Sequence, residues 1–177
     1  MSRTGLAALA LGAWLPGAAA LAHFQEILPS TDAFGGEGEV ALDLTFTHPM
    51  DRGPVMDMAR PVRFGVLTEA GEVDLLETLT EAPRDGKRGW TASYVPAEPG
   101  AYAFFVEPEP YWEPGEDKWI IHYSKVVVDA YDWGSDWDRL VGLPVEIEPL
   151  VRPYGIWTGN LFSGVVRAGG APVPFAE

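Results

Sequence analysis

The stretch "EVALDLTFTH", residues Glu39–His48, decides the fold class because its side chains alternate between an apolar and a more polar face. A period of two residues is that of a β-strand with one face turned to a core. By the same parity His48 continues the apolar face, and Pro49 after it restricts His48 to extended conformations. Apolar side chains occupy every second position, at Val40, Leu42, Leu44 and Phe46.

Five further stretches are strand-like, and Gly- or Pro-containing turns separate them. They are "PVRFGVL" (61–67), "EVDLLETL" (72–79), "GWTASYVP" (89–96), "GAYAFFVEP" (100–108) and "KWIIHYSKVVVDA" (118–130). No segment shows a convincing helical period, and "WGSDWDRLVG" (133–142) could form at most a turn or two. The sequence therefore predicts an all-β protein built as an antiparallel, immunoglobulin-like β-sandwich over residues 23–158.

The last segment, "GNLFSGVVRAGGAPVPFAE" (159–177), resembles the opening of a carboxypeptidase-regulatory-like β-sandwich. In such domains a G-x-V strand is followed by a glycine turn, Pro-Val-Pro and a second strand. We expect residues 159–177 to be the first strand of a second β-sandwich domain that is truncated. A strand without a partner is a poor place for a natural chain to end.

Residues 1–22 have the features of a secretory signal peptide. Arg3 precedes the apolar run "LAALALGAWL" (6–15), and Ala20 and Ala22 place small residues at positions −3 and −1 of a cleavage site. The apolar run is shorter than the roughly 20 residues that a membrane span needs. The sequence thus predicts a periplasmic or secreted protein that begins with His23 and has no membrane span after cleavage.

Composition narrows the classes of partner and ligand. The 177 residues carry 12 basic and 26 acidic side chains, for a net charge of −14, which argues against nucleic acid as a partner. There are no cysteines, so His, Asp, Glu and Met are the possible metal ligands. No serine lies in a G-x-S-x-G context and no glycine-rich phosphate loop is present, which indicates a binding protein and not an enzyme.

The chain has only three histidines, His23, His48 and His122. As the first residue, His23 would offer its α-amine and Nδ1 to one metal ion in a six-membered chelate ring. Each histidine also has an ordinary interpretation: a frayed terminus, a capped residue at the rim, and a satisfied core residue, respectively. Together they predict a nitrogen-rich site suited to Ni(II), Cu(II), Co(II) or Zn(II).

Two neighbouring segments could add to this site. The acidic loop "EPEPYWEPGEDK" before His122 supplies carboxylates that could orient an imidazole or attract a cation. The stretch "HPMDRGPVMDM" contains Met50, Met56 and Met58, whose thioethers could bind Cu(I) or simply fill gaps in the core. The carboxylates of the acidic loop are Glu107, Glu109, Glu113, Glu116 and Asp117.

Several blocks of the chain resemble a bacterial family described as the periplasmic component of cobalt/nickel transport systems, also catalogued as a domain of unknown function. The resemblance implies a metal-handling protein beside an energy-coupling-factor type transporter, with Ni(II) or Co(II) as cargo and His23, His48 and His122 in matching motifs. The blocks are "AHFQEILPS", "LTFTHPMDRGPVMDM", "EPYWEPGEDKWIIHYSKVVV" and "GLPVEIEPLVRPYGIWTGNLFSGVV".

Three other functions fit the same sequence. One is a copper-binding protein of the same architecture that uses the methionines for Cu(I). Another is a copper oxidase that acts on polysaccharide through an N-terminal histidine, with Trp112 and Trp119 as a substrate platform. The last is an adhesion-like sandwich that binds no metal.

Cleavage after Ala22 gives the first testable prediction. The secreted protein should begin with His23, because Ala20-Leu21-Ala22 follows the apolar run at the usual spacing. Intact mass and N-terminal sequencing of the periplasmic protein check this. Any other first residue would remove the α-amine of His23 from the set of ligands.

Overall fold

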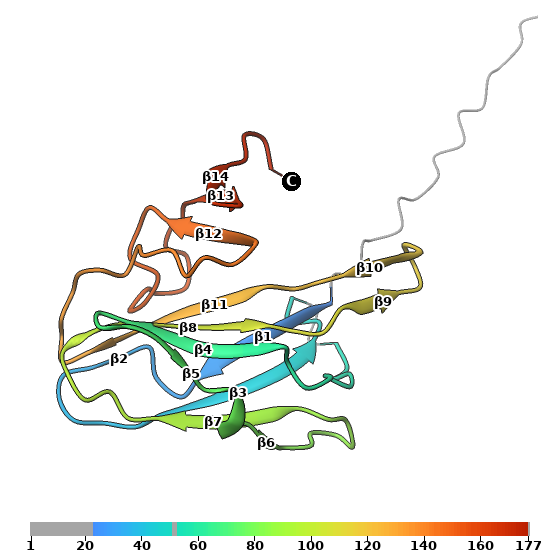
Figure 1. Cartoon of the computed structure of the whole chain (residues 1–177), viewed down its shortest axis with the longest axis horizontal. Helices are drawn as coiled ribbons and strands as arrows, with labels where there is room; N and C mark the ends of the chain where they lie inside the picture. The colour runs from blue at the N-terminus through green and yellow to red at the C-terminus, as the bar shows by residue number, and fades with distance from the viewer. Residues whose placement is uncertain (1–22, 51–52, 177) are drawn as a thin grey trace, which may run out of the picture.

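Two β-sheets pack face to face in the structure, a computed structural model that describes residues 23–50 and 53–176 (Figure 1). The predicted signal peptide lies outside these residues. The first sheet has the order β1 (Phe24–Pro29), β3 (Val40–Thr47), β7 (Trp90–Tyr94) and β6 (Thr80–Glu81). The second has the order β2 (Ala33–Phe34), β11 (Ser124–Ala130), β8 (Gly100–Glu107), β4 (Arg63–Thr68) and β5 (Gly71–Asp74). All strand pairs except the short parallel β2–β11 pair are antiparallel, which confirms the predicted β-sandwich.

The core lies between the two sheets and is built on the alternation of β3. The four apolar side chains of that strand are at most 2% exposed. Burial of each such side chain contributes about 1.5–3 kcal/mol to folding. This face of β3 therefore determines the register of the strand and packs against the second sheet. The same core contains Phe64 and Val66 from β4, Phe104 and Val106 from β8, and Val128 from β11.

Two of the predicted strands are shorter than the sequence pattern indicates. The run 118–130 splits into β10 (Lys118–Ile120) and β11, with His122 in the break. β10 pairs with β9 (Tyr111–Glu113) in a hairpin that projects beyond the end of the sandwich (Figure 1). The run 72–79 is strand only as far as Asp74, whose carboxylate accepts a hydrogen bond from the Leu76 N–H and starts the 3-10 turn η1 (Leu76–Thr78).

A third sheet near the C-terminus has the order β12 (Val145–Pro149), β13 (Gly164–Ala168) and β14 (Ala171–Pro172). The strand expected within residues 159–177 therefore has partners on both sides. The expectation that it lacks one is wrong, because β12 precedes residue 159 and pairs with β13 in the register Ile147↔Val166. A domain boundary after residue 158 stays a prediction.

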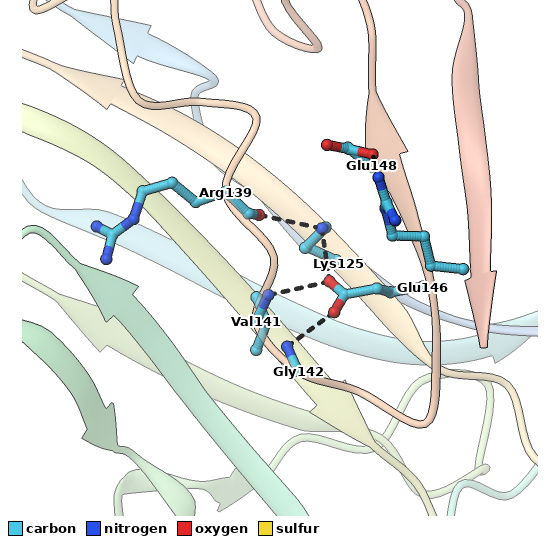
Figure 2. A network of polar contacts seen from close by, with 7 residues as sticks. Lys125, Arg139, Val141, Gly142, Glu146 and Glu148 are labelled. Carbon is cyan, nitrogen blue, oxygen red and sulfur yellow. Dashed lines mark hydrogen bonds and ion pairs between the residues drawn. The ribbon is translucent and has the colours of Figure 1, made fainter. Parts of the chain in front are cut away.

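A buried ion pair joins this third sheet to the sandwich. Glu146 on β12 is 2.8 Å from Nζ of Lys125 on β11, and its side chain is only 4% exposed. Figure 2 shows its carboxylate also accepting hydrogen bonds from the N–H groups of Val141 and Gly142. Burial acts to raise the pKa of Glu146, but the hydrogen bonds from Lys125 and the two N–H groups outweigh it, so the pKa is lowered.

A second contact holds the segment between β12 and β13 against the sandwich. The hydroxyl of the buried Tyr154 donates a hydrogen bond to Asp129 on β11 at 3.2 Å, and the Gly155 N–H donates to Asp32 at 2.8 Å. Burial and the neighbouring Asp129 raise the pKa of Tyr154 to about 12, so the hydroxyl remains a donor at neutral pH.

Within residues 23–50 and 53–176, no helix is long and apolar enough to cross a membrane.

Replacing Glu146 with glutamine should destabilise the protein at neutral pH and matter less in acid. The change leaves Lys125 buried and unpaired, so we expect a loss of about 3 kcal/mol in the free energy of unfolding. The pKa of Glu146 is depressed below its ordinary value of 4.5, so its stabilisation is present above that pH and is lost as the pH falls through the folded-state pKa.

Urea unfolding at pH 7 and in the acid range measures this difference. Glu148→Gln is the matched control, since Glu148 lies on the same strand and pairs with the more exposed Arg167. We expect the control to lose at most about 1 kcal/mol. Equal losses in the two variants would contradict a dominant role for the Lys125–Glu146 pair.

Candidate metal centre

The pairing of β1 with β3 brings His23 and His48 together. Phe24 lies opposite Thr47 in this antiparallel register, so the next pair outward is His23 and His48. His23 has the same parity as the buried Gln25 and Ile27, and both histidines therefore turn toward the interior at the end of the sandwich. Their ring centroids are 3.8 Å apart, and His48 is 7% exposed.

A hydrogen bond between the two sheets brings His122 to the same end. The Ser124 hydroxyl donates to the backbone carbonyl of Gln25 at 2.9 Å, which ties the start of β11 to β1. Two residues earlier, the ring of His122 lies 5.9 Å from that of Phe46. The ring centroid of His23 is also 5.9 Å from that of Phe46. The structure thus gathers all three predicted histidines around the buried Phe46.

The structure adds Glu113, one of the five carboxylates of the acidic loop. Its Oε2 lies 3.0 Å from Nδ1 of His23, and its side chain is only 13% exposed. Tyr111, two residues earlier on β9, packs edge-on against Phe46 with ring centroids 4.8 Å apart. The alternation of β9 therefore turns Tyr111 and Glu113 toward the histidines. The sequence could not single out Glu113 because the β9–β10 pairing is not visible in a three-residue strand.

Two imidazole nitrogens at this end are buried without a hydrogen-bond partner, Nδ1 of His23 and Nδ1 of His122. The contact between His23 and Glu113 has the distance of an ion pair but not the geometry of a hydrogen bond. A buried polar atom left unsatisfied costs about 1–3 kcal/mol, so two in one place require an explanation. A bound cation that accepts both lone pairs would satisfy them.

Burial lowers the pKa of His122, the charge of His23 lowers it further, and the charge of Glu113 partly opposes both. The neutral imidazole of His122 is therefore favoured, and this is the form that ligates metal.

The side chains do not form a finished metal site in this conformation. No group of three or more His, Cys, Asp or Glu side chains in the described parts of the chain is arranged so that it could hold a metal ion. Nδ1 of His23 is turned toward Glu113, the ring of His48 packs against that of His23, and the ring of His122 packs against Phe24 and Phe46. Three nitrogens could meet at one ion only after rotation of these side chains.

The methionines and tryptophans take different places. Met58 lies in the core and Met56 packs against it, as the gap-filling interpretation expects. Met50, two residues after His48, is 86% exposed. Trp112 and Trp119 form an exposed T-shaped pair on the β9–β10 hairpin, with ring centroids 5.5 Å apart.

Fold and site together define an all-β sandwich with a cluster of histidines at one end. A protein family described as "Domain of unknown function (DUF4198)" matches residues 20–177, so the chain belongs to this family. The match includes all three histidines and agrees with the resemblance in the sequence at the level of the family. No curated protein and no solved structure matches the chain.

Replacing Gly53 with alanine should displace His48. The Gly53 N–H donates a hydrogen bond to the His48 carbonyl at 3.0 Å, and an added Cβ would lie 2.5 Å from Cβ of His48. Because side-chain carbons do not approach so closely, His48 or the turn must move, at a cost of about 1–3 kcal/mol. We expect the imidazole NMR signals of His48 and His23 to shift.

Gly36→Ala is the control, because an added Cβ there meets nothing within 4 Å. Unchanged imidazole signals in Gly53→Ala would contradict the close packing of Gly53 on His48.

Proposed function

We propose that this protein is a periplasmic metal-binding protein that carries Ni(II) or Co(II) for a membrane nickel/cobalt uptake transporter. The observation that carries the proposal is the pair of buried, unsatisfied imidazole nitrogens of His23 and His122 beside His48. The resemblance to periplasmic components of nickel and cobalt transport systems supports the choice of metal and partner. The metal is the cargo of the protein and not a cofactor for a reaction.

The donor set suits a divalent transition metal. Imidazole nitrogens bind Ni(II), Co(II), Cu(II) and Zn(II), and the chain has no cysteine that would favour softer ions. After signal cleavage, the α-amine of His23 would add a further nitrogen and close a chelate ring with Nδ1. The orphaned Nδ1 of His23 is the nitrogen that this chelate requires.

The position of the site fits reversible loading. His23 lies directly before β1, at the end of the sandwich where β3 also ends, so the proposed site is at the rim of the sandwich and not in the middle of the core. The imidazoles must rotate before they can share one ion. This rotation costs free energy, and the cost lowers the net affinity for the metal. A carrier that must release its cargo to a transporter is compatible with such a cost.

A copper carrier is the second candidate, and the exposed Met50 favours it. This thioether lies two residues from His48 and is free of the core, whereas Met58 is buried. A site with Met50 and the histidines would accept Cu(I). Substitution of Met50 by leucine should then weaken Cu(I) binding and leave Ni(II) binding unchanged.

Calorimetric titration of the mature protein with Ni(II) and Co(II) tests the proposal. We expect one ion to bind per chain. The variants His23→Ala, His48→Ala and His122→Ala should each weaken binding at least about 10-fold, because mutation of a residue that only supports a ligand already lowers metal affinity by that factor. His23→Ala should be the most damaging, since it removes the chelate ring. Circular dichroism of each variant controls for folding.

A protein with an extra residue before His23, or with an acetylated N-terminus, should bind as weakly as His23→Ala. Both forms lose the free α-amine of His23 while keeping all three imidazoles. If the extended form binds Ni(II) as tightly as the mature form, the terminal chelate is wrong.

A further inference from the structure

We propose that Glu113 is an additional ligand of the metal, supplied by the β9–β10 hairpin, and that its carboxylate selects divalent cations over Cu(I). This inference rests on the proposed function, because it assigns a residue to the same site. It goes beyond the three histidines by making the site a mixture of nitrogen and oxygen donors.

The carboxylate of Glu113 is already oriented toward the histidines. Its Oε1 accepts a hydrogen bond from the Gly115 N–H at 3.0 Å, within the turn of the hairpin. That bond leaves Oε2 directed at His23, 3.0 Å from Nδ1. Tyr111, on the same face of β9, anchors the strand by packing its ring on Phe46. The oxygen that faces the site is thus held by both the turn and the strand.

The charge of Glu113 has no permanent cation beside it. Among the described residues, its only ion-pair contact is with His23, which is charged only when protonated. Two other carboxylates of the acidic loop have basic partners, Glu107 with Arg63 and Glu116 with Lys118. A largely buried and uncompensated carboxylate is unfavourable unless a cation approaches it. A divalent ion between Glu113 and His23 supplies that charge.

The distance between the two donor atoms fits a shared ion. Metal–nitrogen and metal–oxygen bonds are each about 2.0–2.2 Å, so two donors meeting at a right angle are about 3.0 Å apart and at a tetrahedral angle about 3.4 Å apart. Nδ1 of His23 and Oε2 of Glu113 are 3.0 Å apart. This separation is compatible with two donors that meet at a right angle on one ion.

The alternative role for Glu113 is to orient His23 through Nδ1–H while Nε2 binds the metal. The two roles differ in their consequences. A carboxylate ligand favours hard or intermediate divalent ions and adds little for Cu(I), whereas a residue that only orients His23 supports every metal at the site. The comparison of Ni(II) with Cu(I) therefore separates the ligand from the orienting residue.

The experiment titrates the mature full chain and its Glu113→Gln variant with Ni(II), with Co(II), and with Cu(I) delivered from a competing chelator. We expect Glu113→Gln to weaken Ni(II) and Co(II) binding at least about 10-fold. Cu(I) binding should change less than about 3-fold, and the visible absorption bands of bound Co(II) should shift. We expect Glu113→Ala to show the same pattern of losses. This second variant shows that the losses do not come from the amide group that glutamine introduces.

Glu116→Gln is the matched control, because it removes the same charge from the same hairpin at an exposed position that pairs with Lys118. It should bind all three ions as the wild type does. Equal Ni(II) affinity in Glu113→Gln and wild type overturns the inference and leaves the histidine site standing. Parallel losses for Ni(II) and Cu(I) also overturn it, in favour of an orienting role. Failure of the wild type to bind Ni(II) or Co(II) overturns the proposed function, and this inference with it.

Discussion

The register of β1 on β3 is the constraint on which the rest of the site depends. This register turns Gln25 and Ile27 inward beside Phe46 and Leu44. A slip of one residue would turn every side chain of β1 to the opposite face and bring the charged Glu26 inward between Phe24 and Leu28, which is costly. The same slip would separate His23 from His48. The packing of β1 on β3 thus fixes the pairing of His23 with His48.

The positions of His122 and Glu113 in the candidate site depend on contacts between separate elements. Ser124 holds the start of β11 against β1, and this contact places His122 beside Phe46. Tyr111 does the same for the β9–β10 hairpin, with Phe46 again as the surface against which it packs. Phe46 is therefore the common support of the cluster. Its side chain is only 2% exposed, and its strand β3 pairs with β1 and β7, so core packing fixes the position of this support.

The sequence predicts those parts of the fold that local alternation determines. The core face of β3 follows from a period of two residues, and the strands β4, β7 and β8 follow from short apolar stretches flanked by turns. The sequence also selects all three histidines, because they are rare in an acidic chain and stand at unusual positions. The sequence also predicts that the three share one nitrogen-rich site, but it does not show that they gather around Phe46.

What the sequence does not predict depends on pairings between distant segments. The break at residues 121–123 arises because β10 leaves the sandwich to pair with β9. The pairing of β12 with β13 joins segments about 20 residues apart, and the ion pair of Glu146 with Lys125 joins β12 to the sandwich. Neither contact can be read from the local sequence. Glu113 is one of five similar carboxylates in the loop until the hairpin turns it toward His23. In the proposed site, three imidazoles and one oriented carboxylate form a donor set of intermediate hardness. Two strands, a strand break and a hairpin each position a part of this set. Because no single element positions all four side chains, loss of any one contact would loosen the proposed set.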